Sequence, residues 1–280
     1  MTAPRLVTAD GVRLAARWWR PRPADATGEA VVVVHGFCAR KDAPAVELIA
    51  LQQSAAGRLV LTFDLRGHGE SDGATTLGRD EGLDVDAAVA AARRECDHVV
   101  VVGSSMGGVA TIEHMAGTDR VATIGHMAGT EGIARNPDGG PGRADGAVIV
   151  ATPARWRVPR TARGVLALVI TQTGPGRAVA VRRLGTRVAV RPSRGREPVV
   201  RLREVTRPVA VLHGLADRFV APSAARLLHG ALTGPRLLEL VPGMGHGFCP
   251  AAAGPIDDAV AWVVDQVPEA RPRAEGRAPR

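Results

Sequence analysis

The sequence predicts an α/β fold that carries an insertion. Short runs of β-branched and aliphatic residues alternate with segments whose apolar residues recur at helical spacing. The length of 280 residues and the apolar share of 45% suit one α/β domain with an insertion, or two small domains. Several of the apolar runs end in a short motif rich in Gly, His or Ser, so we expect the chemistry at the ends of strands.

The most informative of these motifs follows Val99–Val102. The four valines lead into Gly-Ser-Ser-Met-Gly, and a helical pattern comes next, which is the strand–turn–helix context of Gly-x-Ser-x-Gly. Ser105 would then lie on a tight, strained turn, and positions 103 and 107 must lack side chains so that strand and helix can approach. The turn would expose the hydroxyl and direct the N–H of Met106 at an oxyanion. For this motif alone, a glycine-rich turn that only packs a helix on a strand is the alternative.

The rest of the chain fits the same alternation. Asp10-Gly11 is a favoured hairpin turn pair between the first two apolar runs, and Gly57 is placed to end the first helix. The predicted strands cover residues 6–7, 12–19, 30–34, 59–63, 99–102, 147–151, 208–212 and 237–241. The predicted helices cover residues 43–56, 83–94, 165–171, 178–184, 198–205 and 256–267, with a split at 174–176 between the third and the fourth.

A duplication follows the serine motif. The segment Val109–Arg120 recurs, with three substitutions, as Val121–Gly132. On one continuous helix the second copy would be rotated by about 120°, so that its apolar stripe would not face the sheet. We therefore expect a break near Gly117. The duplication also accounts for His114 and His126, and because no Cys or carboxylate completes a ligand set, we predict no metal site.

The positive charge is concentrated in one region of the chain. The formal net charge is +8, and between Arg155 and Arg207 there are 14 Arg against two Glu, a net of +12. The segment 271–280 adds a net of +3, so the framework itself is acidic. The arginines of this insertion would attract an acidic substrate or carrier. Alternatively, they form a solvated surface without a specific ligand.

Cysteine content and hydropathy indicate the compartment. Three cysteines in a chain of this length argue against a disulfide framework and for a reducing environment. The first residues lack the apolar core of a signal peptide, and no run approaches 18 apolar residues. We expect a cytoplasmic protein without a membrane span.

Five motifs together resemble the α/β-hydrolase fold superfamily, in particular its serine esterase, lipase and S33-peptidase-like branch. They are His-Gly at 35–36, Asp-x-Arg-Gly-His-Gly-x-Ser at 64–71, Gly-x-Ser-Met-Gly-Gly at 103–108, His-Gly-x-x-Asp at 213–217 and Gly-x-Gly-His-Gly at 243–247. The resemblance covers residues 30 to about 250. It implies a mostly parallel sheet of about eight strands, with helices on both faces and a small cap. The implied divisions are a first core segment (residues 1–152), an arginine-rich cap (153–207), a second core segment (208–268) and a disordered basic tail (269–280).

The resemblance also implies the roles of the site residues. Ser105 would be the nucleophile, His246 the general base and Asp217 the carboxylate that orients the histidine, in the chain order of α/β-hydrolases. The backbone N–H groups of Phe37 and Met106 would form the oxyanion hole. This chemistry needs no metal and no organic cofactor.

Three further residues near these motifs have less direct roles. In the family, the loop that contains His68 braces neighbouring turns, so His68 is expected to be structural. Cys38 and Cys249 each lie within three residues of a proposed site group and would line the pocket or simply pack as small residues, the latter being favoured.

These observations predict a serine hydrolase of the carboxylesterase or thioesterase type. A serine at position 105 argues against the carboxylate-nucleophile chemistries of the fold. An acyltransferase or a C–C bond hydrolase would use the same triad. A non-catalytic, basic nucleic-acid-binding protein would fit the pI of about 11, but few aromatic residues are present for stacking and the triad would be unexplained. The expected partner is a small acyl ester or thioester, anionic or carrier-bound if the arginines are specific, with no specific nucleic acid.

Overall fold

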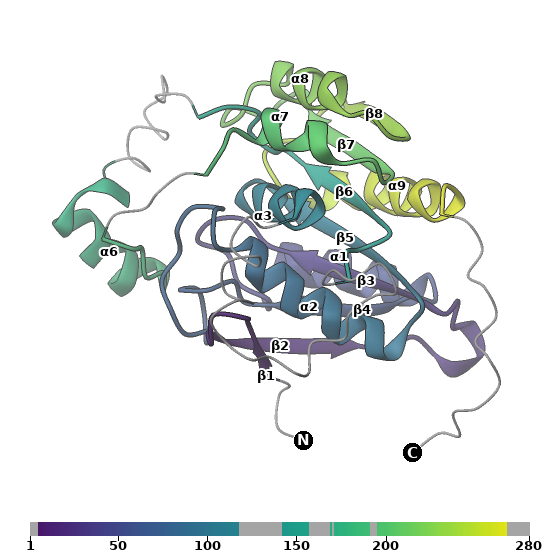
Figure 1. Ribbon diagram of the computed structural model, residues 1–280, viewed down its shortest axis with the longest axis horizontal. Coiled ribbons are helices and arrows are strands. Elements are labelled where there is room, and N and C mark those ends of the chain that lie inside the picture. Colours follow the sequence, from purple (N-terminus) through teal and green to yellow (C-terminus); the bar gives the residue numbers. More distant parts are fainter. Residues whose placement is uncertain (1–4, 118–141, 157–168, 170, 191–194, 268–280) are drawn as a thin grey trace.

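A mostly parallel β-sheet forms the centre of the molecule (Figure 1). The computed structural model describes residues 5–117, 142–156, 169, 171–190 and 195–267. Within these ranges the sheet has eight strands in the order β1-β2-β4-β3-β5-β6-β7-β8. They are β1 (Arg5–Val7), β2 (Arg13–Trp19), β3 (Glu29–Val34), β4 (Leu59–Phe63), β5 (His98–Ser104), β6 (Gly146–Val150), β7 (Val209–Gly214) and β8 (Arg236–Val241). Strands β3 to β8 are parallel, and β1 and β2 are antiparallel to their neighbours.

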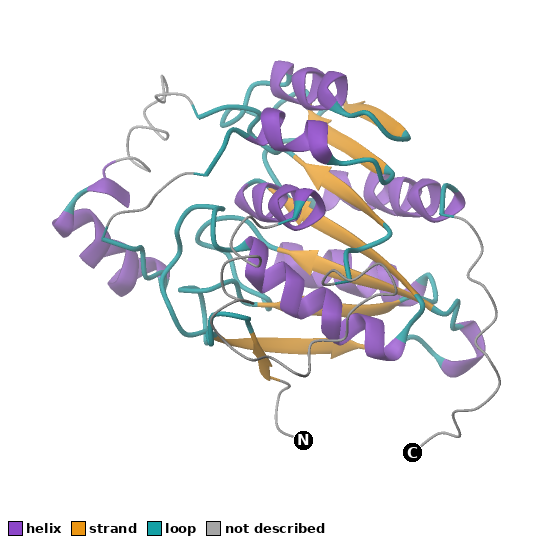
Figure 2. Ribbon diagram, in the orientation of Figure 1, coloured by secondary structure: helices purple, strands orange, loops and turns teal. Residues whose placement is uncertain are grey.

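Helices cover both faces of this sheet (Figure 2). On one face lie α1 (Pro44–Ala55) and α9 (Ala253–Asp265). On the other lie α2 (Gly82–Glu95), α3 (Met106–Ala116), α7 (Pro198–Arg201) and α8 (Ser223–Ala231), whereas α6 (Gly174–Leu184) lies apart from both layers. Short 3-10 helices cover Pro23–Asp25, Leu202–Glu204 and Pro250–Ala252. The predicted fold class is confirmed, and none of the described helices combines the length and apolar content needed to cross a membrane.

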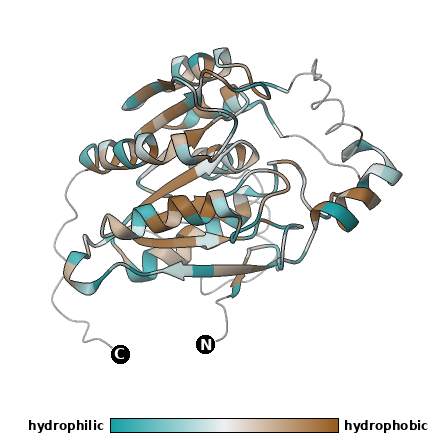
Figure 3. Ribbon diagram, turned by 180° about the vertical axis from the view of Figure 1, so that it is seen from behind, coloured by the Kyte–Doolittle hydropathy of each residue, from teal (hydrophilic) through white to brown (hydrophobic). Residues whose placement is uncertain are grey.

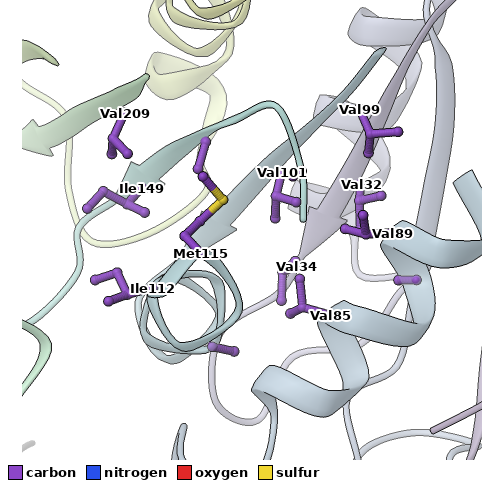
Figure 4. Packing of buried hydrophobic residues seen from close by; sticks show 14 of the residues in the cluster. Val32, Val34, Val85, Val89, Val99, Val101, Ile112, Met115, Ile149 and Val209 are labelled. Atoms are coloured by element: carbon purple, nitrogen blue, oxygen red, sulfur yellow. The ribbon is translucent and has the colours of Figure 1, made fainter. Parts of the chain in front are cut away.

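Alternating valines of the central strands fill the two cores. Val32 and Val34 of β3 face Val85 and Val89 of α2 (Figure 4), whereas Val31 belongs to the cluster formed with α1 and α9. Seen from behind, the central strands are correspondingly hydrophobic (Figure 3). Each buried valine side chain contributes about 1.5–3 kcal/mol to folding. The central strands are therefore firmly held.

Helix α6 differs from its prediction. It begins at Gly174, inside the stretch where the sequence predicts a split. The Thr173 hydroxyl accepts a hydrogen bond from the N–H of Gly176 at 3.0 Å, which caps the helix. Pro175 lies in the first turn, where its missing N–H costs no hydrogen bond. Gly174-Pro175-Gly176 is therefore a helix start, and most of the predicted helix 165–171 lies outside the described residues.

Helix α3 ends at Ala116, and Gly117 follows with φ 84°, where the sequence predicts a helix end. The second copy of the duplication, which includes His126, lies outside the described residues. His114 Nδ1 is 2.6 Å from Asp86 Oδ1, and its Nε2 accepts the N–H of Ala144 at 3.0 Å. His114 thus joins α3 to α2 and to the segment before β6. Over the described ranges of the chain, no three His, Cys, Asp or Glu side chains group as metal ligands would.

The insertion returns to the core at the loop after β4. Thr186 forms a β-bridge with His68, and Val188 forms one with Thr75. The Arg187 guanidinium donates to carbonyl oxygens of this loop, at 2.9 Å to that of Gly73. Because β4 and β5 run parallel to β3, this docking point lies at the same edge of the sheet as the serine motif.

Candidate active site

Ser105 lies on the sharp turn between β5 and α3. Its backbone has φ 54° and ψ −114°, a conformation that costs on the order of 1–3 kcal/mol for a residue other than glycine. A Cβ on Gly103 would lie 2.6 Å from the carbonyl oxygen of Gly107, and a Cβ on Gly107 would lie 2.4 Å from that of Val34. The prediction that positions 103 and 107 must lack side chains is confirmed. The N–H of Ser105 donates to the carbonyl of Val150 on β6 at 2.9 Å.

Three side chains from three separate loops form one chain of hydrogen bonds. Ser105 Oγ is 3.0 Å from His246 Nε2, and His246 Nδ1 is 2.8 Å from Asp217 Oδ2. Because a carboxylate only accepts, His246 carries its proton on Nδ1 and presents the lone pair of Nε2 to the serine hydroxyl. The structure therefore brings together the three residues for which the sequence predicts catalytic roles.

Backbone hydrogen bonds join the loop that carries Asp217 to the loop that carries His246. The N–H of Leu215 donates to the carbonyl of Val241 at 3.0 Å, and the N–H of Ala216 donates to that of Met244 at 3.0 Å. The distance between the carboxylate and the imidazole is thus set by main chain as well as by side chains.

Asp217 has a fully buried side chain. Its Oδ1 accepts the N–H groups of Phe219 and Val220 at 2.7 and 3.0 Å. Burial alone would raise the pKa of this carboxyl, but hydrogen bonds from His213, His246 and the backbone outweigh burial and hold the pKa well below its usual range. Asp217 is therefore ionised at neutral pH.

The two predicted oxyanion donors flank Ser105. A Cβ on Gly36 would lie 3.4 Å from the Cβ of Ser105, which places the Gly36–Phe37 peptide beside the serine. Met106 is the first residue of α3, where N–H groups have no helical partner. Among the described residues, neither the N–H of Phe37 nor that of Met106 donates to a loop, turn or side chain.

The other residues singled out by the sequence are not members of this hydrogen-bond chain. His68 is fully buried, with Nδ1 3.0 Å from the carbonyl oxygen of Arg66 and its ring edge-on to Phe37. Burial raises the pKa of the Cys38 thiol to about 11, so the thiol stays protonated. Cys249 is half-buried and packs against the core on the α1 and α9 face.

Two contacts of the site were not predicted. The ring of Phe219 stacks on His246, with centroids 5.1 Å apart and planes at 25°. His213 Nε2 lies 3.3 Å from Asp217 Oδ2. The spacing of four residues between His213 and Asp217 is the one signal in the sequence that could have drawn attention to the second contact.

The sequence matches a family model described as "Alpha/beta hydrolase family" over residues 31–266. The chain belongs to this family. Membership supports hydrolase activity on a small-molecule substrate. A search of curated proteins found no match for this alpha/beta hydrolase.

Solved esterases share the fold of this alpha/beta hydrolase. The esterase Pf2001 of Pyrococcus furiosus is 17% identical, with a TM-score of 0.66 over 95% of this chain and 91% of that chain. The esterase RhEst1 of Rhodococcus sp. ECU1013 is 20% identical, with a TM-score of 0.60 over 95% of this chain and 100% of that chain. Est1E of Butyrivibrio proteoclasticus, solved with ferulic acid, is 15% identical, with a TM-score of 0.61 over 93% of this chain and 98% of that chain. At these identities the likeness is one of fold.

Proposed function

We propose that this chain is a serine hydrolase that cleaves a carboxylic ester or thioester through an acyl-enzyme on Ser105. The observation that carries the proposal is the unbroken chain of hydrogen bonds from Ser105 through His246 to Asp217. A serine hydroxyl is a weak nucleophile at neutral pH, and an imidazole oriented by an ionised carboxylate activates it.

In the acylation step Ser105 Oγ attacks the carbonyl carbon while His246 Nε2 takes the hydroxyl proton. Asp217 remains ionised, keeps the ring in its tautomer and stabilises the imidazolium. The oxyanion accepts hydrogen bonds from the N–H groups of Phe37 and Met106, each worth about 3 kcal/mol in the transition state. Collapse of the tetrahedral intermediate breaks the C–O or C–S bond, and the leaving group takes the proton from Nε2.

Deacylation reverses these roles with water as the nucleophile. His246 takes a proton from the attacking water, and the second tetrahedral intermediate uses the same two N–H donors. Its collapse releases the carboxylic acid and returns the proton to Ser105. Transfer of the acyl group to another acceptor would follow the same route and differ only in the product.

We further propose that segment 153–207 is a small cap that favours an anionic acyl substrate, such as a coenzyme A thioester or an acyl group on an acidic carrier protein. Arg182 and Arg183 are exposed on α6, and the return segment pairs with the loop after β4. A positive potential near the mouth of a site raises the local concentration of anionic substrate.

The first test is the hydrolysis of p-nitrophenyl esters from acetate to dodecanoate by the wild type and by Ser105→Ala, followed by intact mass after treatment with a fluorophosphonate. Ser104→Ala is the matched control, because Ser104 is the adjacent serine and is buried at the end of β5. We expect one adduct on the wild type and on Ser104→Ala, and neither adduct nor turnover with Ser105→Ala.

Turnover that survives in Ser105→Ala would contradict the proposal. Product analysis in the presence of an alcohol or amine acceptor separates hydrolysis from acyl transfer. The rate across the ester series gives the acyl-chain length that the site accepts.

A further inference from the structure

His213 lies beside the carboxylate of Asp217. It is the fifth residue of β7 and is fully buried. Its Nε2 lies 3.0 Å from the carbonyl oxygen of Val220 and 3.3 Å from Asp217 Oδ2. Both neighbours are acceptors, so Nε2 carries the proton; it donates to the Val220 carbonyl and lies within ion-pair distance of the Asp217 carboxylate.

We propose that His213 is a positioning residue that holds Asp217 Oδ2 toward His246 and keeps the carboxylate from rotating. This inference rests on the proposed function, because it concerns the same hydrogen-bond chain. His213 would contact neither the substrate nor the serine and would act only through Asp217.

The hydrogen bonds of Asp217 support this role. Oδ1 is held by the two backbone N–H groups of Phe219 and Val220, and Oδ2 is shared by His246 and His213. Without His213, Oδ2 would have His246 as its one donor among these contacts, and the carboxylate could follow the imidazole instead of orienting it. Donors that fix a functional group in this way commonly control its activity.

The other nitrogen of His213 argues against a packing role. Nδ1 is buried and has no hydrogen-bond partner within the described ranges of the chain. A buried polar atom without a partner is unfavourable, and a leucine at this position would avoid it. The polar contacts of Nε2 therefore explain a histidine at this position better than packing of the ring does.

The pKa of Asp217 also indicates that His213 acts on the carboxylate. Among the residues that the structure describes, the titratable groups paired with its carboxylate are His213 and His246. Burial raises the pKa of Asp217, and the hydrogen bond from His213 is the largest of the contributions that lower it. Removing this donor should make the carboxylate more basic, which stabilises the His246 imidazolium and moves the acid limb of the kcat/KM profile to higher pH.

The test compares His213→Leu with His213→Gln, whose amide nitrogen can take the place of Nε2. The readouts are kcat and KM for p-nitrophenyl butyrate, the pH profile of kcat/KM and the rate constant for labelling by a fluorophosphonate, which does not depend on the folded fraction. In His213→Leu we expect kcat and the labelling rate constant to fall about tenfold, with KM nearly unchanged and the acid limb at higher pH. His213→Gln should recover most of both rates.

Three results would overturn the inference. In the first, both variants keep the wild-type rates and pH profile while Ser105→Ala is inactive, which leaves the proposed function intact. In the second, kcat and the labelling rate constant fall equally in both variants, the pH profile is unchanged and the thermal midpoint is lower. The role of His213 would then be structural, through its hydrogen bond to the Val220 carbonyl. In the third, Ser105→Ala retains turnover, and the proposed function fails with the inference.

Discussion

A Cβ on Gly214 would lie 2.1 Å from the carbonyl oxygen of Met244, so the end of β7 and the loop that carries His246 are in direct backbone contact. The same carbonyl accepts the N–H of Ala216. Only a residue without a side chain allows this approach. The separation of Asp217 from His246 therefore depends on a glycine that takes no part in the chemistry.

Gly214→Ala should displace the loop of His246 and lower kcat by about tenfold or more, because misplacing a catalytic group by about 1 Å has effects of this size or larger. Gly245→Ala is the matched control, because no atom lies within 4 Å of its added Cβ and its φ is not positive. Ester hydrolysis and circular dichroism of both variants test this. Equal activity of the two variants would show that the loop adapts.

Asp217→Asn should lower kcat by about three orders of magnitude or more. The N–H groups of Phe219 and Val220 require an acceptor at the Oδ1 position, so the amide NH2 would face His246. The imidazole would then carry its proton on Nε2 and could not accept the proton of Ser105. Steady-state kinetics measures the loss, and a loss of less than about tenfold would contradict this tautomer argument.

Ser105→Gly should abolish turnover yet raise the free energy of unfolding above that of Ser105→Ala by roughly 1 kcal/mol. Glycine tolerates the positive φ at this position, whereas alanine keeps the strain of the serine. Urea unfolding of the two inactive variants measures the difference. Equal stability would mean that the turn holds little strain.

His35 should make the protein less stable at acidic pH. Burial, with the nearby His68, lowers the pKa of His35 to about 3, and its Nε2 accepts the N–H of Leu65. In the unfolded chain the group titrates near 6.5. Between these values the unfolded chain binds more protons, so the free energy of unfolding falls as the pH falls from 6.5, by up to about 1.4 kcal/mol per pH unit.

Urea unfolding between pH 7 and 4 measures this effect in the wild type and in His35→Gln. The change in the free energy of unfolding per pH unit should be smaller in His35→Gln than in the wild type. Equal changes in both proteins would contradict the assignment to His35.

The double variant Arg182→Gln, Arg183→Gln should raise KM for a coenzyme A thioester by roughly 3- to 10-fold at low salt and leave KM for p-nitrophenyl acetate unchanged. Arg187 is left in place, because its guanidinium holds the carbonyl of Gly73. Arg226→Gln, on the exposed side of α8, is the control for net charge. Equal effects on both substrates would contradict a specific role of the cap arginines.

Strands β3 to β7 could be predicted to within about two residues because their side chains are buried on both faces and leave a continuous apolar run. Helix α8 could not be predicted. Helix α8 has nine residues, of which Ala225 and Leu228 are buried, so it is short and contributes little to the core. The start of α6 was predicted wrongly because Pro175 ends helices in most positions but begins this one.

The candidate site could be located from the order of its motifs, because the carboxyl ends of parallel strands share one edge of the sheet. This places Ser105, Asp217 and His246 together, although their catalytic roles remain predictions. The contact of His213 with Asp217 depends on the direction of a ring, and the stacking of Phe219 depends on the path of the loop. The four-residue spacing of His213 and Asp217 draws attention to the first contact but does not fix the direction of the ring, and no residue pattern indicates the second.

The turn at Ser105 has a consequence beyond the serine itself. Its backbone is fixed by the close approach of Gly103 to Gly107 and by the bond to Val150, not by any contact of the serine side chain. The main chain thus fixes the position of the Cβ at residue 105. The atom bonded to this Cβ would lie at the same point in any side chain placed there. A thiol or a carboxylate at position 105 would meet the same imidazole and the same N–H donors, so the reaction could change while the scaffold stays as it is.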